Sequence, residues 1–485
     1  MKKIHVLFLL MVALVTFTVS CKKSDTTATP VVLAPIFTVS PNSLSFTEAG
    51  GNSPVTVAMN GSSWTATSDQ TWCTLSANSS SSASSIVTIT AAANTSANLR
   101  TATLTFIMDG KTTVSVYVLQ AAPSNLYPSY KDSIAPDAMG MSSDAKTLAS
   151  KINSIGLNIG NTLEAMGGEI AWGNPMITNS FVQFAKKSGF NAVRLPCSWN
   201  QYANQTTAKI SDTWLARVKQ VVQYCVDNNL YVILNIHWDG GWLENNCTTA
   251  KKDSVNAKQK AFWEQIATTM RGFDEHVIFA SANEPNAADA TQMGVLLSYH
   301  QTFIDAVRST GGKNAYRVLV VQGPNTDIGN TNTLMTTMPA DKVANKLMAE
   351  VHFYTPYNFC GMTQDQTWGN QFYYWGAGNH STTDLAHNPT WGEEAEVDRL
   401  FLLMKNQFVD KGIPVIIGEF GAILRTNLTG SAFQLHLASR AYFFNYVKKH
   451  ALANGFLPFY WDTGGLLDRK NNTVLDQQDL DALIN

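Results

Sequence analysis

Two patterns of apolar and polar residues divide the chain. Between residues 37 and 122, apolar and polar residues alternate in short runs, such as 102–107 and 114–119, and clusters of turn-forming residues separate these runs. Alternation with a period of two at this spacing is typical of the strands of a small all-β sandwich. Asp109-Gly110 lies between two such runs and predicts a hairpin turn.

From about residue 142 onward, short apolar segments alternate with stretches that carry apolar residues on one helical face. Eight segments have the character of buried parallel strands: 156–161, 192–196, 231–237, 277–284, 318–323, 347–354, 415–420 and 456–461. Helical spacing is clear at 214–225 and at 397–408, and Gly412 is placed as a stop for the second of these helices. The pattern predicts an α/β fold, a closed (β/α)8 barrel preceded by a small immunoglobulin-like all-β sandwich.

The start of the chain has a third pattern. A positively charged start precedes a mostly apolar run from 6 to 19, which is too short for a membrane span, so residues 1–21 are predicted to be a signal peptide. The end of this segment resembles the signal of bacterial lipoproteins, in which Cys21 would carry the lipid. Thr18 stands where that pattern usually has Leu, so an ordinary secretory signal remains the alternative.

We therefore expect a signal peptide at 1–21, a linker at 22–34, a sandwich at 35–122, a second linker at 123–137 and a barrel at 138–485. No later stretch has eighteen uninterrupted apolar residues. Membrane contact is then expected only through the lipid anchor. We expect a monomer that this anchor holds on the outer membrane, either on its periplasmic side or at the cell surface.

Composition narrows the range of partners. Hydrophobic residues make up 45% of the chain, which excludes wholesale disorder, and charged residues only 14%. The net charge of −2 provides no basic field for a nucleic acid. A chain rich in uncharged polar and aromatic residues, including 12 Trp, suits an uncharged polar partner such as a sugar, although solubility alone also favours this composition.

The cysteines do not indicate a metal site. Besides Cys21 there are five, an odd number that cannot all pair within one molecule. Cys225 lies on the apolar face of a helix and is predicted to be a core residue, whereas Cys197 and Cys247 could form a disulfide in an oxidising compartment. Because no Cys or His spacing typical of zinc ligands occurs, we expect no structural metal.

Candidate catalytic residues lie where the predicted strands end. In a parallel barrel the chemistry takes place at the C-terminal ends of the strands. In chain order these ends carry Arg194, His237, Asn283, Glu284, His352, Tyr354, Glu419 and Trp461. Glu284 and Glu419 come from opposite sides of the barrel and point at one centre, so we interpret them as a catalytic pair rather than as solvated loop acids.

The barrel resembles glycoside hydrolase family 5, a group of retaining β-glycanases, over essentially all of residues 142–485. All eight strand-end residues occupy positions that mark the family. Residues 156–164 and 172–175 are similar to the subfamily of endo-β-1,4-glucanases and xyloglucan-specific enzymes. Leu157 stands where many relatives have an aromatic residue and Glu164 where many have Asp, departures that concern substrate preference more than chemistry.

The sandwich resembles the BACON domain over about 85 residues. The resemblance rests on the strand spacing and on Ser63-Trp64 and Trp72-Cys73. The family was named for a suspected role in carbohydrate binding, and its members often act as spacers. Trp64 and Trp72 could stack on sugars, but at this spacing a Trp is more often a core residue.

The family resemblance implies a catalytic role for each acid. Glu284 would be the general acid/base, with a pKa raised by burial and by the charge of Glu419. Glu419 would be the nucleophile, which Arg194 holds ionised and Tyr354 contacts through its hydroxyl group. This route needs no metal and no cofactor.

The remaining strand-end residues are predicted to bind the substrate. Asn283 would meet the sugar 2-hydroxyl group, and Trp461 would stack under the reacting sugar. His237 and His352 would position hydroxyl groups and the acid, with a purely structural role as the alternative for either one. Four loop tryptophans are either walls of an extended cleft or cores of their own loops: Trp172, Trp242, Trp368 and Trp375.

Taken with the family resemblance, these residues predict a retaining endo-β-1,4-glucanase that acts on a plant cell-wall β-glucan, with xyloglucan as the first choice. The alternatives are an endo-hydrolase of mixed-linkage glucan or glucomannan, an exo-acting glucosidase, and a non-catalytic glycan-binding lipoprotein. Because non-catalytic relatives usually lose one of the two acids, the presence of Glu284 and Glu419 argues against the last.

Overall fold

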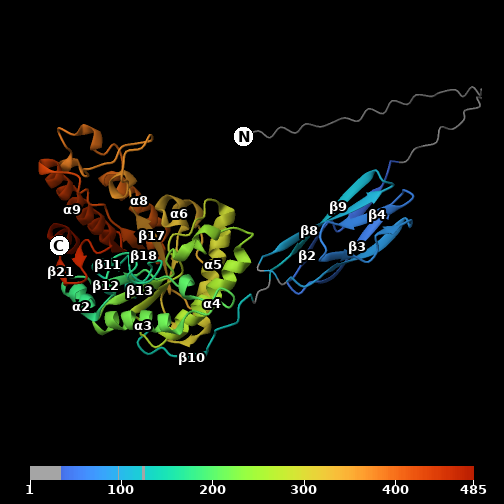
Figure 1. Ribbon diagram of the computed structural model, residues 1–485, viewed down its shortest axis with the longest axis horizontal. Helices are drawn as coiled ribbons and strands as arrows, with labels where there is room; N and C mark the ends of the chain where they lie inside the picture. The colour runs from blue at the N-terminus through green and yellow to red at the C-terminus, as the bar shows by residue number, and fades with distance from the viewer. Residues whose placement is uncertain (1–33, 95, 97, 123–125) are drawn as a thin grey trace, which may run out of the picture.

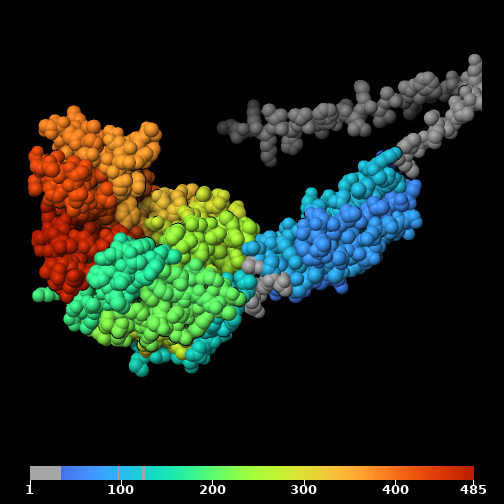
Figure 2. Space-filling model, in the orientation of Figure 1, coloured from blue at the N-terminus to red at the C-terminus, as the bar shows by residue number. Residues whose placement is uncertain are grey.

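The computed structural model describes residues 34–94, 96, 98–122 and 126–485 (Figure 1). The predicted signal peptide 1–21, with Cys21, and residues 22–33 of the predicted linker lie outside these ranges. Within the described ranges, no helix is both long enough and apolar enough to cross a membrane. The sandwich and the barrel form two separate lobes, the sandwich blue in Figure 2.

The N-terminal lobe is a sandwich of two β-sheets, as predicted. One sheet has the strand order β1-β3-β7-β5 and the other the order β2-β9-β8-β4-β6. The strands are β1 (Phe37–Ser40), β2 (Ser43–Phe46), β3 (Gly51–Met59), β4 (Trp64–Ser68), β5 (Cys73–Leu75), β6 (Ser79–Ser80), β7 (Ser84–Ala91), β8 (Arg100–Met108) and β9 (Thr112–Gln120). Asp109 and Gly110 adopt φ angles of 49° and 67° in the turn that joins β8 to β9, which confirms the predicted hairpin.

The two tryptophans of the sandwich differ in burial. Trp64 is only 1% exposed and packs in the core, 5.6 Å from the ring of Phe106. Trp72 is half-buried, and the guanidinium of Arg100 lies 4.2 Å from its ring centroid. Trp64 is therefore a core residue and Trp72 packs at the edge of the core under a cation.

The second lobe is a closed barrel of eight parallel strands, as predicted. The strands neighbour one another in chain order: β11 (Gly156–Ile159), β12 (Ala192–Leu195), β13 (Tyr231–Asn235), β14 (Val277–Ala280), β16 (Leu319–Gln322), β17 (Leu347–Phe353), β18 (Val415–Phe420) and β19 (Phe456–Asp462). β11 pairs with β19 and closes the ring. A register shift between Val351 and His352 in the pairing of β17 with β18 sets Glu419 opposite His352.

Helices surround the barrel (Figure 1). They are α2 (Asn179–Lys187), α3 (Asp212–Asp227), α4 (Lys252–Met270), α5 (Ala290–Ser309), α6 (Ile328–Leu334), α8 (Glu394–Gln407), α9 (Gly430–Ala453) and α10 (Gln477–Ile484). The predicted helices at 214–225 and 397–408 correspond to α3 and α8, and Gly412 adopts a left-handed φ of 84° soon after α8. Short helices and strands fill the loops: β10 (Ile134–Pro136), α1 (Ala145–Lys151), β15 (Gly311–Gly312), α7 (Tyr357–Cys360), β20 (Leu467–Asp468) and β21 (Thr473–Val474).

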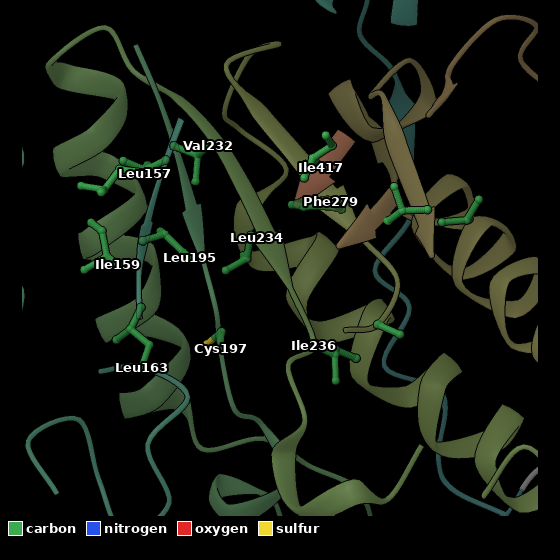
Figure 3. Close-up of a cluster of buried hydrophobic side chains, with 14 of the residues drawn as sticks. Leu157, Ile159, Leu163, Leu195, Cys197, Val232, Leu234, Ile236, Phe279 and Ile417 are labelled. Atoms are coloured by element: carbon green, nitrogen blue, oxygen red, sulfur yellow. The ribbon is translucent and has the colours of Figure 1, made fainter. Parts of the chain in front are cut away.

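Alternate residues of each strand face opposite sides of the barrel wall. Leu157, Leu195, Leu234 and Phe279 belong to the buried cluster between strands and helices (Figure 3). A separate cluster fills the barrel interior toward the N-terminal ends of the strands, and α1 packs against it. Its members include Leu148, Ile233, Ile278, Val320, Met348, Ile416, Leu457 and Phe459. Polar side chains occupy the next layer, toward the strand ends.

The second predicted linker is shorter than expected. Within residues 123–137, Tyr127 packs against the barrel core, and hydrogen bonds attach the chain to the barrel from Ser129 onward. The backbone N–H of Tyr130 donates to the Glu264 carboxylate at 2.6 Å, and β10 pairs in parallel with β15. Tyr130 also donates its hydroxyl to the carbonyl of Thr207 at 2.8 Å.

All five cysteines in the described ranges are free and buried. The disulfide considered between Cys197 and Cys247 is therefore absent, because each thiol instead points at a carbonyl close to it in sequence. Cys197 Sγ lies 3.8 Å from the carbonyl of Ser198, and Cys247 Sγ lies 3.9 Å from that of Leu243. Cys225 packs in the core, as predicted.

Candidate active site

Two carboxylates meet at the C-terminal end of the barrel. Glu284 follows β14, and Glu419 is the fifth residue of β18. One oxygen of each, together with one nitrogen of His352, lies within 4.8 Å of the other two atoms. The side chain of Glu284 is 46% exposed and that of Glu419 only 7%. One acid thus faces the solvent side of the site, and the other is held beneath it.

Arg194 of β12 fixes the buried acid. Its side chain is fully buried, and its Nη1 donates to Oε1 of Glu419 at 2.9 Å and to Oδ1 of Asn158 at 3.0 Å. Its Nη2 donates to Oδ1 of Asn283 at 2.7 Å. Because Arg194 occupies the oxygen of Asn283, the amide nitrogen of Asn283 is left to donate to a ligand.

Tyr354 holds the second oxygen of the same acid. Its hydroxyl group donates to Oε2 of Glu419 at 3.1 Å. Burial, followed by the charges of Glu419 and Glu284, raises the pKa of Tyr354 well above its ordinary value. Tyr354 therefore stays a hydrogen-bond donor at every working pH.

His352 joins the two acids. Its Nδ1 lies 2.8 Å from Oε1 of Glu284 and 3.7 Å from Oε2 of Glu419. Burial lowers the pKa of His352, but Glu419, Glu284 and Glu350 outweigh it and raise the pKa to about 9. The imidazole is thus positively charged at neutral pH.

The expectation of a raised pKa for Glu284 is wrong for this structure. Burial does raise the pKa, but the hydrogen bond and the charge of His352, followed by the charge of Arg194, lower it further. The net result is a pKa below the ordinary value. The sequence places Glu284 beside Glu419 but does not show that a charged imidazole lies between them.

His237 and Trp461 stack on each other. Their rings are nearly parallel, with a 7° interplanar angle and centroids 5.7 Å apart. Nδ1 of His237 lies 3.3 Å from the amide nitrogen of Asn235, so Nδ1 accepts that hydrogen bond. Burial, followed by the charges of Arg194 and His352, lowers the pKa of His237 well below its ordinary value, so this imidazole is neutral.

A cavity of about 690 Å³ opens over these groups. Glu284, Tyr354, Glu419 and Trp461 line one part of it, and it continues past Ile423 and Leu424 toward Arg440 and Asp476. All eight strand-end residues singled out by sequence thus surround one centre. The structure places them together; the role of each remains a prediction.

The four loop tryptophans do not line this cavity in the described chain. Trp375 is fully buried and donates its indole N–H to the carbonyl of Gly392 at 2.9 Å, so it is a loop core. Trp242 is half-buried against Phe262. Trp172 and Trp368 are 48% and 63% exposed, and Trp368 lines a separate hollow of about 420 Å³.

The two departures from the family pattern also lie away from the cavity. Leu157 packs between the barrel wall and the helices, and Glu164 is buried, where it accepts the backbone N–H groups of Asn161 and Thr162. Neither side chain lines the catalytic cavity. The sequence suggested that Leu157 and Glu164 affect substrate preference, but neither side chain is placed to contact a substrate in this cavity.

Sequence reasoning missed a polar layer directly beneath the acids. Glu350, Asn158 and Gln322 are fully buried on the inner faces of their strands. The signal was available for Glu350, because it lies two residues from both Met348 and His352 and so shares their face of β17. Glu350 lies in the middle of an apolar strand, so a rule that selects only strand ends does not find it.

The two acids and His352 are close enough to surround a cation. However, the guanidinium of Arg194 already lies 2.9 Å from Glu419, and His352 is itself positively charged. A metal ion would meet both charges, so we assign no metal role to this cluster.

Comparison with known proteins identifies both lobes. The profile of cellulase (glycosyl hydrolase family 5) matches residues 153–465, and that of BACON, described as an N-terminal binding domain, matches residues 62–121. The xyloglucan-specific endo-β-1,4-glucanase BoGH5A of Bacteroides ovatus is 35% identical over 482 residues, which cover 95% of this chain and 91% of that protein. Endoglucanase A of Paenibacillus barcinonensis is 33% identical over 363 residues, 68% of this chain and 87% of that protein.

Solved structures show the same relationship. A Bacteroides ovatus family 5 xyloglucanase in complex with a XXXG heptasaccharide has a TM-score of 0.68 and 32% identity, covering 93% of this chain and 99% of that one. XEG5B, a xyloglucan-specific β-1,4-glucanase from a ruminal metagenomic library in complex with XXLG, has a TM-score of 0.65 and 39% identity, covering 70% of this chain and 95% of that one. The chain therefore belongs to glycosyl hydrolase family 5 and is a glycoside hydrolase of the endo-β-1,4-glucanase type.

Proposed function

We propose that this protein is a retaining endo-β-1,4-glucanase whose substrate is xyloglucan. The observation that carries the proposal is the carboxylate pair of Glu284 and Glu419, whose nearest oxygens lie within 4.8 Å. Retaining glycosidases separate their two carboxyl groups by about 5–5.5 Å, whereas inverting enzymes leave about 6.5–9.5 Å for a water molecule. The short separation favours direct attack by one acid on the sugar.

Glu419 is proposed as the nucleophile. Arg194 and Tyr354 each hold one of its oxygens, at 2.9 and 3.1 Å, which keeps the carboxylate oriented for attack. In the first step it attacks the anomeric carbon, and the bond to the leaving sugar breaks. The product of this step is a glycosyl ester on Glu419.

Glu284 is proposed as the acid/base. It donates a proton to the leaving oxygen in the first step, and in the second it removes a proton from the water that hydrolyses the ester. Its open position toward the cavity suits contact with a leaving sugar and then with water. Its hydrogen bond with His352 links its protonation to that of the imidazole.

The other strand-end residues are proposed to position the sugar. The free amide nitrogen of Asn283 would donate to the 2-hydroxyl group, a contact that strengthens in the transition state. The indole of Trp461 would stack on the apolar face of the ring, and neutral His237 would hydrogen-bond a hydroxyl group beside it.

Two observations support xyloglucan within the β-glucans. The similarity to BoGH5A extends over 95% of the chain and thus includes the sandwich as well as the barrel. The catalytic cavity of about 690 Å³ extends beyond the acids along the ends of β18 and β19, which leaves space for a substituted chain.

Product analysis tests the substrate. The purified protein is incubated with xyloglucan, barley β-glucan, carboxymethylcellulose and glucomannan, and the early products are separated by size. We expect xyloglucan to be cut fastest and to yield oligosaccharides. Preference for glucomannan would overturn the glucan assignment, preference for barley β-glucan would replace xyloglucan by mixed-linkage glucan, and early release of single sugars would indicate an exo-acting enzyme.

Azide rescue tests the assignment of the acids. E419A should lose hydrolysis and, with azide, give a glycosyl azide of inverted configuration, because azide takes the place of the nucleophile. E284A should give one of retained configuration, because azide attacks the glycosyl enzyme. Hydrolysis by E419A at the wild-type rate would refute the mechanism, whereas binding without hydrolysis by the wild type would leave glycan binding as the function.

We also propose that Cys21 carries a lipid that holds a monomeric enzyme on the outer membrane. The motif at 1–21 supports this proposal, and it lies outside the described residues. Metabolic labelling with a fatty acid should mark the wild type and not C21S, and C21S should move to the soluble fraction. Equal labelling of both proteins would exclude the anchor, and sedimentation of C21S gives the oligomeric state.

A further inference from the structure

A third carboxylate lies beneath the catalytic pair. Glu350 is on the inner face of β17 and is completely buried. It pairs in register with Gln322 of β16 and Ile416 of β18, one layer above the apolar filling of the barrel. A charge at this depth is costly unless it is paired, so its partners indicate its purpose.

Every partner of Glu350 is a donor, and two of them belong to the catalytic site. Its Oε1 forms an ion pair with Nε of Arg194 at 2.9 Å and a hydrogen bond with Nε2 of His352 at 3.3 Å. Its Oε2 accepts from the amide nitrogen of Gln322 at 2.6 Å. Burial raises the pKa of Glu350, but Arg194 and then His352 leave it below the ordinary value, so the group is ionised.

An ionised Glu350 dictates how His352 is protonated. A carboxylate can only accept hydrogen bonds, so its contact at 3.3 Å, shorter than the 3.5 Å from Nη2 of Arg194 to the same nitrogen, places a hydrogen atom on Nε2 of His352. A second proton is then shared between Nδ1 of His352 and Oε1 of Glu284, which are 2.8 Å apart. These two residues titrate as one unit, the Glu284–His352 pair.

We propose that Glu350 is a positioning residue that keeps the shared proton on the Glu284–His352 pair, so that the enzyme retains its acid as the pH rises. The inference rests on the proposed function, in which Glu284 must hold a proton to cleave the glycosidic bond. It follows that loss of this shared proton, rather than titration of Glu284 alone, produces the alkaline limb of the pH profile.

The charges around the Glu284–His352 pair determine the direction in which its pKa shifts when Glu350 is neutralised. The titratable and charged groups near it are Arg194, His237, Glu244, Glu350, Tyr354 and Glu419. Arg194 disfavours the protonated pair, and Glu350 and Glu419 favour it. Removal of the negative charge of Glu350 therefore makes the pair lose its proton at a lower pH.

The test compares kcat/KM against pH for the wild type and E350Q on xyloglucan oligosaccharides. Because kcat/KM reports the free enzyme, its alkaline limb follows the pair before substrate binds. We expect the limb of E350Q to lie about 1–3 pH units lower, the usual effect of one nearby charge. An active E350Q with an unmoved limb, or with a limb at higher pH, would overturn the proposal.

Two variants separate charge from packing. In Q322E/E350Q the carboxylate moves from position 350 to position 322. The amide introduced at position 350 can donate a hydrogen bond to this carboxylate. The carboxylate can also still accept the backbone N–H of Ala282. We expect this double variant to recover part of the lost shift. E264Q neutralises another buried carboxylate, one that binds Ser129 and Tyr130 outside the site, and should leave the limb unchanged.

A direct measurement covers the case in which E350Q does not fold. Nitrogen-15 NMR of the labelled histidines in the wild-type protein should show His352 with a hydrogen on Nε2 throughout the titration. A neutral His352 with its hydrogen on Nδ1 would overturn the proposal. This readout does not depend on activity, so it separates failure of the inference from failure of the proposed function.

Discussion

Gly418 of β18 lies so close to the Glu350 side chain of the neighbouring strand β17 that position 418 has no room for a side chain. A Cβ atom added to Gly418 would lie 1.9 Å from Oε1 of Glu350. The carbonyl of the same glycine accepts from Asn158 at 2.8 Å, which fixes the backbone just before Glu419. The glycine is thus a consequence of the buried carboxylate.

The first prediction concerns G418A. The added methyl group must displace Glu350 or the backbone that carries Glu419, and overpacking of this kind costs about 1–3 kcal/mol. We expect lower thermal stability and a reduced kcat/KM, measured by calorimetry and by initial rates. G294A is the matched control, because Gly294 is exposed in α5 with nothing within 4 Å of an added Cβ. It should gain about 0.5–1 kcal/mol and keep its activity.

The second prediction concerns the hydroxyl group of Tyr354. Y354F removes its hydrogen bond to Oε2 of Glu419. A hydrogen bond to a charged group contributes about 1.5–3 kcal/mol, so kcat should fall roughly 10- to 150-fold. Y117F, which alters an exposed tyrosine of the sandwich, should behave as the wild type. An undiminished kcat for Y354F would mean that Arg194 orients Glu419 without help.

The third prediction concerns stability against pH. The pKa of His352 is about 9 in the folded protein, above the value of 6.5 for a free side chain. Its stabilising contribution is thus fully present below pH 6.5 and is lost as the pH rises through about 9. We expect the difference in unfolding free energy between the wild type and H352N to shrink over this range, by no more than about 3 kcal/mol. A difference that grows as the pH rises over this range would contradict the assignment of a charged imidazole.

The fourth prediction separates two tryptophans of the long loop that follows β17, orange at the upper left of Figure 2. Trp375 is completely buried against Phe443, with ring centroids 5.0 Å apart, whereas Trp368 is 63% exposed. W375A should therefore destabilise the protein by about 3–5 kcal/mol in denaturant unfolding. W368A should stay within about 0.5 kcal/mol of the wild type. Equal effects would show that Trp375 does not anchor this loop to α9.

The barrel and the position of its site were predictable from sequence because both follow from short-range rules. Apolar strands alternate with amphipathic helices, and polar residues such as Arg194 and Glu419 interrupt otherwise apolar strands at one end. The sequence pattern therefore locates the centre of the site. The hydrogen bonds within it depend on side chains that come from several different strands.

The features that the sequence did not predict depend on contacts between side chains from different strands and loops. The pKa of Glu284 depends on a contact with His352 from another strand, and the free state of Cys197 and Cys247 depends on where the loops direct their thiols. Whether a loop tryptophan packs inward, as Trp375 does, is decided by the fold of a long insertion. None of these has a local signal in the chain.

The attachment of residues 129–137 to the barrel has a practical consequence for anyone who wishes to separate the lobes. A truncated protein that begins at residue 138 would lose β10 and would leave the Glu264 carboxylate without the Ser129 and Tyr130 donors that offset its burial. A truncated protein that begins at residue 126 keeps β10 and the two donors to Glu264. The smallest catalytic unit therefore begins earlier in the chain than the domain pattern alone would suggest.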